Sequence, residues 1–118
     1  MNFEHPLLLL SVLIGVIFII AGFIVLKFPP KKINSLYGYR TKSSMKNKEQ
    51  WKFAQKYSSI LMIYCGIGLL LIGCLLYFIL GDINPIIGML IGMVSMFVSI
   101  GIMLYKTETA IKQQFKSE

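Results

Sequence analysis

The chain has 118 residues, of which 56% are hydrophobic and only 14% are charged, and its formal net charge is +7. Soluble domains carry roughly a quarter charged residues, so this composition excludes an ordinary soluble protein. At this length we expect a single integral membrane domain over residues 1–118, of all-α class, built as a three-helix bundle.

The first expected element is a membrane-spanning helix over residues 7–26. Its twenty residues carry no charge, and sixteen of them are Leu, Ile, Val or Phe. Together they favour insertion by roughly 5–10 kcal/mol, and about 20 residues suffice to cross the hydrocarbon core. A cleaved signal peptide is the alternative, but such peptides have a basic flank and a shorter apolar core. A spanning helix is therefore the better interpretation.

A basic loop over residues 27–57 follows. Pro29 and Pro30 end the first helix, because proline lacks a backbone donor and disfavours helical geometry in the preceding residue. The loop is much longer than the 2–8 residues that commonly join neighbouring helices. We therefore expect it to have structure or a task of its own.

A short amphipathic helix is expected inside this loop. Asn47 and Gln50 have the spacing of a capping box, and Trp51, Ala54 and Ser58 would share one face of the helix that starts there. A basic ridge at i, i+4 and i+8 is formed by Lys48, Lys52 and Lys56. The helix would either lie along the inner leaflet or run directly into the second span.

Two further spans are expected over residues 58–80 and 86–105, followed by a tail over 106–118. Both are uncharged and long enough to cross the bilayer. The turn over 81–85 contains Gly and Asn-Pro, which favour tight turns. The second and third spans should therefore form an antiparallel hairpin.

Small residues recur at helical spacing in all three spans. The positions are Ser11, Gly15 and Gly22, then Ser59, Gly66 and Gly73, then Gly88, Gly92, Ser95 and Ser99. Such stripes let helix backbones approach closely in lipid, which predicts a compact bundle. The GxxxG of Gly88 and Gly92 could instead serve a homo-oligomer.

The distribution of basic residues predicts the orientation. Nine of the twelve Lys and Arg residues lie between Lys27 and Lys56, and the other three lie in the tail. Positive charge near a span resists translocation, so the loop and the C-terminus should be cytoplasmic and the N-terminus outside. The expected location is the plasma membrane, and the basic residues should also attract anionic lipids.

Arg40 stands out because it is the only arginine beside eleven lysines. A planar, multidentate donor suits a carboxylate, a phosphate or backbone carbonyls. Arg40 therefore either binds a ligand or structures its own loop, and both interpretations stay open. No catalytic, cofactor-binding or metal site is expected, because the sequence has no triad, acid pair, metal-ligand cluster or phosphate loop. Nucleic acid is not an expected partner, since the basic residues are tied to a membrane surface.

The loop carries a spaced motif, N-x3-G-Y-R-T-x5-N-x3-W-x2-A. Its residues are Asn34, Gly38, Tyr39, Arg40, Thr41, Asn47, Trp51 and Ala54. With this motif, roughly residues 25–105 resemble the SdpI/YfhL family of Gram-positive bacteria, and in particular the C-terminal half of its larger members. The motif residues are the candidates for binding a partner or shaping the loop.

This resemblance implies an immunity protein that binds or neutralises a secreted, membrane-active toxin peptide, with no enzymatic activity. The alternative is signal transduction, in which the basic loop sequesters a cytosolic transcriptional regulator; larger members of the family have such a role, which the resemblance alone does not carry over to this chain. A small transporter is less well supported, because transport normally uses an ionisable residue within the membrane and all three spans lack one.

Overall fold

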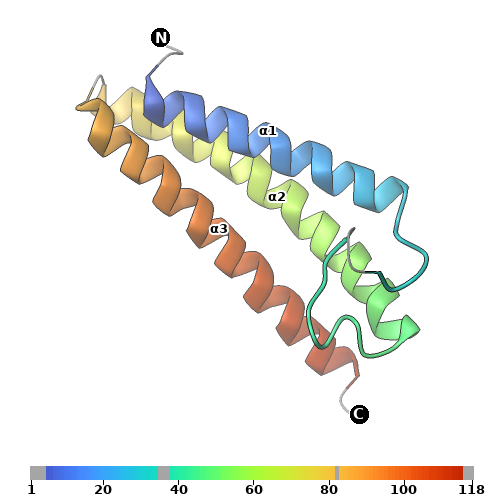
Figure 1. Cartoon of the computed structure of the whole chain (residues 1–118). Helices are drawn as coiled ribbons and strands as arrows, with labels where there is room; N and C mark the ends of the chain where they lie inside the picture. Colours follow the sequence, from blue (N-terminus) through green and yellow to red (C-terminus); the bar gives the residue numbers. More distant parts are fainter. Residues whose placement is uncertain (1–4, 35–37, 82, 116–118) are drawn as a thin grey trace.

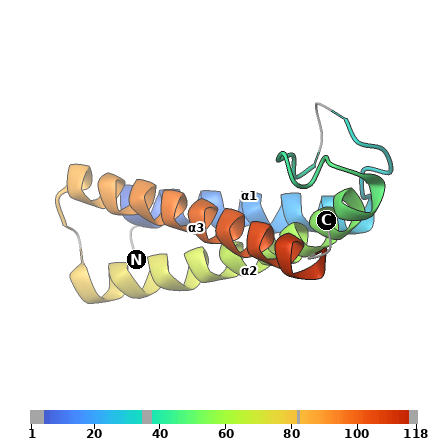
Figure 2. The same cartoon turned by 90° about the horizontal axis from the view of Figure 1, so that it is seen from below.

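The computed structural model describes residues 5–34, 38–81 and 83–115. Its three helices are α1 (Pro6–Lys27), α2 (Lys48–Leu80) and α3 (Pro85–Gln114) (Figure 1). The chain runs up and down the bundle, so α2 is antiparallel to both α1 and α3. We call the end that holds the α2–α3 turn the turn end, and the opposite end, where α1 and α3 finish, the loop end (Figure 1, Figure 2).

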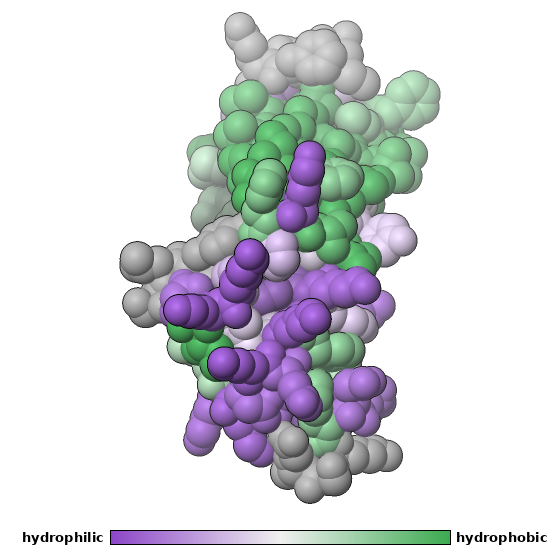
Figure 3. Space-filling view, turned by 90° about the vertical axis from the view of Figure 1, so that its right-hand side faces the viewer, coloured by the Kyte–Doolittle hydropathy of each residue, from purple (hydrophilic) through white to green (hydrophobic). Residues whose placement is uncertain are grey.

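All three helices are long and apolar enough to span a membrane. The protein is thus a multi-pass membrane protein with three candidate spans, and the expected all-α class is confirmed. Hydrophilic side chains gather over the loop end, while hydrophobic side chains cover the rest of the face that Figure 3 shows. The surface therefore changes from apolar to polar close to the loop end of the bundle.

The expected amphipathic helix is not a separate element; of the two arrangements expected for it, the structure shows the one in which it runs directly into the second span. The cap itself is confirmed, because the Gln50 amide donates to Asn47 Oδ1 (2.8 Å) and Asn47 Nδ2 donates to Gln50 Oε1 (3.0 Å). The helix that begins there continues without a break to Leu80. No proline lies within it and its first glycine is Gly66, so nothing in the sequence interrupts the helix at the expected boundary near residue 58.

α3 also extends beyond its expected span, through most of the segment assigned to a tail. Past Tyr105 the helix continues for more than two turns to Gln114. Met103, Thr107 and Ile111 follow one another at i, i+4 and i+8 and are all buried, so this extension has its own packed face. At its other end, Asn84 caps the helix by accepting from the Ile86 amide (2.9 Å), and Pro85 occupies the first turn.

The small residues of α1 and α2 pack directly against each other. A Cβ placed on Gly15 would lie 2.8 Å from the carbonyl oxygen of Gly66, and one placed on Gly22 would lie 2.7 Å from that of Ser59. Ser11 and Gly73 make the third such contact. The two stripes therefore face each other in antiparallel register, as expected for close packing in lipid.

The glycines of the GxxxG motif face α1 of the same chain. A Cβ on Gly88 would lie 2.8 Å from the His5 ring, and one on Gly92 would lie 3.1 Å from Leu10 Cβ. His5 also contacts Ile83, because its Nε2 lies 2.8 Å from the Ile83 carbonyl oxygen. In this structure the motif mediates a contact within the chain and helps to close the turn end.

Gly66→Ala should lower the free energy of unfolding by about 1–3 kcal/mol, because the new methyl group would overlap the backbone of Gly15. Gly68→Ala is the matched control on the same helix, where an added Cβ would meet no described atom within 4 Å. It should be neutral or slightly stabilising, since Ala is the better helix former. Unfolding in mixed micelles, followed by circular dichroism, measures both. Equal effects of the two substitutions would contradict this packing.

Candidate functional site

The segment from Gly38 to Ser44 folds back onto the loop end of the bundle, and Gln55 of α2 holds its start. The Tyr39 amide donates to Gln55 Oε1 (2.6 Å), and Gln55 Nε2 donates to the Tyr39 carbonyl oxygen (2.7 Å). Gln55 is only 1% exposed. Both backbone groups of Tyr39 are thus paired by one buried side chain, much as a neighbouring strand would pair them.

Gly38 allows the chain to approach Gln55. Its φ is 102°, a region that residues with a Cβ rarely adopt. A Cβ at this position would lie 2.5 Å from Gln55 Oε1 and 2.8 Å from the Pro30 ring. Both the positive φ and the lack of room for a Cβ therefore favour glycine at this motif position.

Glu108, on the extension of α3, holds the other side of the segment. Its carboxylate accepts hydrogen bonds from the hydroxyls of Tyr39 (2.7 Å), Thr41 (2.9 Å) and Ser43 (2.6 Å). Ser44, which is fully buried, accepts from the Thr41 amide (2.8 Å). Together with Gln55, these contacts fix the segment between α2 and α3.

The same contacts shift two pKa values outside the apolar spans. Burial by itself would raise the pKa of Glu108, but hydrogen bonds from Ser43, Tyr39 and Thr41 and the charge of Lys112 together lower it. Burial, and next the hydrogen bond to Glu108, raise the pKa of the Tyr39 phenol. At neutral pH the phenol therefore keeps its proton and donates it to an ionised carboxylate.

The remaining aromatic and small motif residues anchor the loop to α2. Trp51 is 2% exposed and its indole N–H donates to the Pro30 carbonyl oxygen (2.8 Å), while Ala54 is fully buried. Gln50 Nε2 donates to the Ser43 carbonyl oxygen (2.9 Å). The face predicted for Trp51, Ala54 and Ser58 is therefore the buried face of the helix.

The two other polar motif residues lie nearer the surface. Asn34 is partly buried and its Nδ2 donates to the Lys32 carbonyl oxygen (3.0 Å). Arg40 is exposed, and within the described part of the chain no side chain or backbone group forms a hydrogen bond or ion pair with it. The residues on either side of Arg40 make hydrogen bonds that hold the loop: Tyr39 with Gln55 and Glu108, and Thr41 with Glu108.

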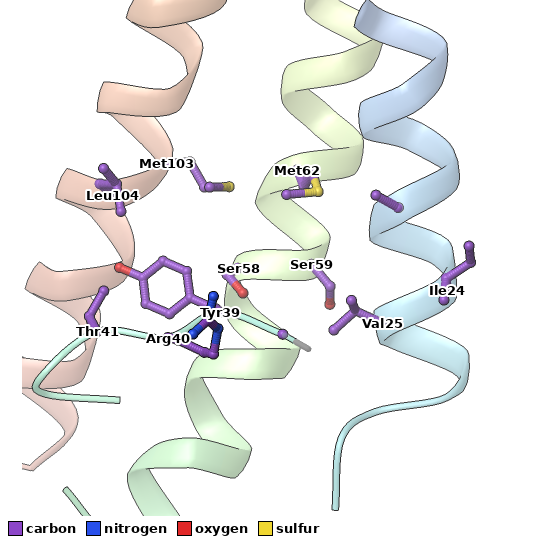
Figure 4. Close-up of a pocket in the computed structure, with 12 residues that line it drawn as sticks. Ile24, Val25, Tyr39, Arg40, Thr41, Ser58, Ser59, Met62, Met103 and Leu104 are labelled. Carbon is purple, nitrogen blue, oxygen red and sulfur yellow. The ribbon is translucent and has the colours of Figure 1, made fainter. Parts of the chain in front are cut away.

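Beside Arg40 a cavity of about 460 Å³ opens between the helices. Figure 4 shows Ile24 and Val25 of α1 on one side, Ser58, Ser59 and Met62 of α2 behind, and Met103 and Leu104 of α3 on the other side. Gly38, Tyr39, Arg40 and Thr41 form its edge at the loop end. The motif thus closes one end of a largely apolar space.

Sequence reasoning missed Gln55, Ser43, Ser44 and Glu108. Gln55 had a recognisable signal, because it occupies a position of the helix face that Trp51 and Ser58 share. The signal for Glu108 was weaker. It is an acidic residue between the basic residues Lys106 and Lys112, and it directly follows Thr107, which lies at i+4 from Met103. None of the spacings indicated that these side chains would meet the loop motif.

These features describe a small multi-pass membrane protein with an ordered loop at one end. Comparison with known families assigns it: the profile of the SdpI/YfhL protein family matches residues 31–106, well over half of the chain. The chain belongs to this family, as the motif predicted. The matched segment contains the folded loop, all of α2 and the apolar part of α3.

A curated relative comes from Bacillus subtilis (strain 168) and is named "Uncharacterized protein YfhL". It is 48% identical to this chain over 62 residues, which cover 52% of this chain and 56% of the relative. The chain therefore spans about half the length of the curated relative that it matches. No solved structure matches the chain.

The carboxylate of Glu108 should titrate below the ordinary Glu range of about 4.3 in a carbon-13 NMR titration in uncharged micelles. Because its folded pKa is lowered, the contact contributes stability above the ordinary range and loses it as the pH falls through the folded pKa. Tyr39→Phe combined with Thr41→Val should raise the midpoint, whereas Tyr105→Phe, at an exposed tyrosine, should not. A wild-type midpoint at or above the ordinary value would refute the hydroxyl cluster.

Proposed function

We propose that this chain is a membrane immunity protein, which protects its cell from a secreted, membrane-active toxin peptide. The observation that carries the proposal is family membership over residues 31–106, which takes in the motif loop, all of α2 and the apolar part of α3. The loop motif resembles that of proteins which protect Gram-positive bacteria in this way. In this proposal the protein acts by binding the peptide, without enzymatic chemistry.

We also propose that the loop end faces the cytosol. Nine basic residues lie between Lys27 and Lys56, and Lys106 and Lys112 lie on the extension of α3, so these eleven belong to the loop end. Retaining them in the cytosol satisfies the positive-inside rule for all three spans. The turn end would then face the side from which a secreted peptide arrives.

The surface proposed for the peptide is a hollow of about 310 Å³ between α2 and α3, which we call the α2–α3 hollow. Its lining is formed by Cys65, Gly68, Leu69, Ile72, Val94, Ser95, Val98, Ser99 and Ile102. Gly68 leaves open space, since an added Cβ would meet no described atom within 4 Å. Small residues along an apolar hollow allow a further helix to approach closely in lipid, which suits a membrane-inserted peptide.

Cysteine labelling tests the orientation. In a background that lacks Cys65 and Cys74, single cysteines replacing exposed Lys42 and Gln113 should react with a membrane-impermeant maleimide only after permeabilisation. One replacing exposed Asn84 should react in intact cells. Modification of the Lys42 position in intact cells would overturn the proposed sidedness.

Expression in a toxin-sensitive bacterium tests immunity. We expect the wild type to raise survival against at least one secreted peptide of a panel, and Gly68→Leu to abolish this gain by filling the α2–α3 hollow. Gly101→Leu is the matched control, because it places the same side chain at another open glycine, outside that hollow. Unchanged killing across the panel, with membrane insertion confirmed, would sink the proposal. An equal loss of survival with Gly68→Leu and Gly101→Leu would rule out the α2–α3 hollow as the docking surface, without contradicting immunity itself.

A second candidate function is capture of a cytosolic regulator by the loop end. It is favoured by the exposure of Arg40 on a segment that Gln55 and Glu108 hold in place, since a fixed, unpaired arginine suits recognition of an acidic partner. Copurification with the wild type but not with Arg40→Ala would support this function. Equal recovery with both proteins would count against it.

A further inference from the structure

The cavity beside Arg40 lies where the helices change from apolar to charged. Ile24 of α1 precedes Lys27 by one turn, and Leu104 of α3 lies two residues before Lys106. In a membrane whose hydrocarbon covers the apolar stretches, this level is the headgroup region of the adjacent leaflet. The cavity is therefore placed where a phospholipid keeps its phosphate and the first part of its acyl chains.

The cavity has two chemically distinct parts. Its walls are apolar and come from all three helices: Ala21, Ile24, Val25, Met62, Met103 and Leu104. Its edge at the loop end carries Arg40 together with the hydroxyls of Thr41, Ser58 and Ser59. A volume of about 460 Å³ lies within the roughly 300–1,000 Å³ typical of small-molecule sites. This division of the lining suits a ligand with an anionic head and an apolar chain.

Arg40 supplies a cation with which no described residue pairs. The residues on either side of it both donate to Glu108, whereas Arg40 has no hydrogen-bond or ion-pair partner among the described residues. Its guanidinium offers five N–H donors in a planar fork, which matches two oxygens of a phosphate group. Because Gln55 and Glu108 hold the backbone around it, this donor is presented at a fixed place on the edge of the cavity.

The nearby serines complete the polar edge. Ser58 donates to the Gln55 carbonyl oxygen (3.4 Å) and Ser59 to the Lys56 carbonyl oxygen (2.9 Å). Their hydrogens are thus engaged within α2, and their oxygens remain available as acceptors. A headgroup that carries hydroxyl groups next to its phosphate, such as glycerol, supplies the donors that these oxygens lack.

We propose that this cavity binds one anionic phospholipid, with its phosphate on Arg40 and part of an acyl chain against the apolar walls. The net charge of +7 and the exposed Lys42 and Lys106 complement such a lipid. A free phosphate would leave the apolar walls unused, and a zwitterionic lipid would bring a headgroup cation that offsets the attraction of its phosphate to Arg40. The site depends on neither the proposed immunity nor the proposed orientation, since it belongs to whichever leaflet adjoins the loop end.

Native mass spectrometry of the full chain tests this site. After delipidation, the protein is titrated with phosphatidylglycerol and, separately, with phosphatidylcholine. We expect one phosphatidylglycerol per chain, retained at least about tenfold more strongly than phosphatidylcholine, because choline places a cation beside the phosphate that Arg40 binds and brings no hydroxyl donor to Ser58 and Ser59. Arg40→Gln should remove most of this preference. Lys46→Gln, which removes the same charge from an exposed loop position outside the cavity, should leave it nearly unchanged.

Two further measurements keep the proposal falsifiable. Ala21→Leu leaves the charge unchanged and fills the cavity from α1, so it should also weaken retention of the lipid. Inorganic phosphate should not displace the lipid, because it lacks the chain. Equal losses with Arg40→Gln and Lys46→Gln, displacement by phosphate, or a second copy of the chain in place of the lipid would each overturn the assignment. Thermal unfolding of each variant should match the wild type, and if Arg40→Gln unfolds, it is replaced by Arg40→Lys, which keeps the charge but loses the fork.

Discussion

The loop end depends on one buried contact, the pairing of Gln55 with both backbone groups of Tyr39. Without it, the segment after Gly38 would have to satisfy these groups in water and would leave α2. With it, the hydroxyls of Tyr39 and Thr41 reach Glu108, and the loop joins α2 to the extension of α3. Arg40 lies between these two residues, exposed at the edge of the cavity, so the position of the candidate site follows from how its neighbours are held.

The packing of the helices determines where the loop segment and the cavity lie. α1 and α2 approach closely through Gly15 and Gly66, and α3 meets α1 near the turn end through Gly88 and Gly92. From there α1 and α3 diverge toward the loop end (Figure 1), where the motif segment and the cavity lie between them. The helices thus pack closely at the turn end and diverge at the loop end, so the cavity opens where the surface of the bundle changes from apolar to polar.

Much of the fold could be predicted because the signals are local. Charge-free stretches of about twenty residues define the spans, and the cap formed by Asn47 and Gln50 fixes where α2 begins. The sequence left open whether the helix after Asn47 is separate from the second span, because apolar content, not helical continuity, changes near residue 58. The partners of the small-residue stripes and the role of Glu108 could not be predicted, since Tyr39 and Glu108 lie 69 residues apart and spacing carries no information on such contacts.

Hydrogen exchange at the Tyr39 amide tests most directly whether the loop is held as described. In the wild type we expect this amide to be protected, and Gln55→Ala should raise its exchange rate by about five- to thirteenfold, because a net hydrogen-bond contribution of roughly 1–1.5 kcal/mol is lost. Gln113→Ala, at an exposed glutamine of α3, should leave the rate unchanged. A wild-type Tyr39 amide that exchanges as fast as an unstructured peptide would contradict the account.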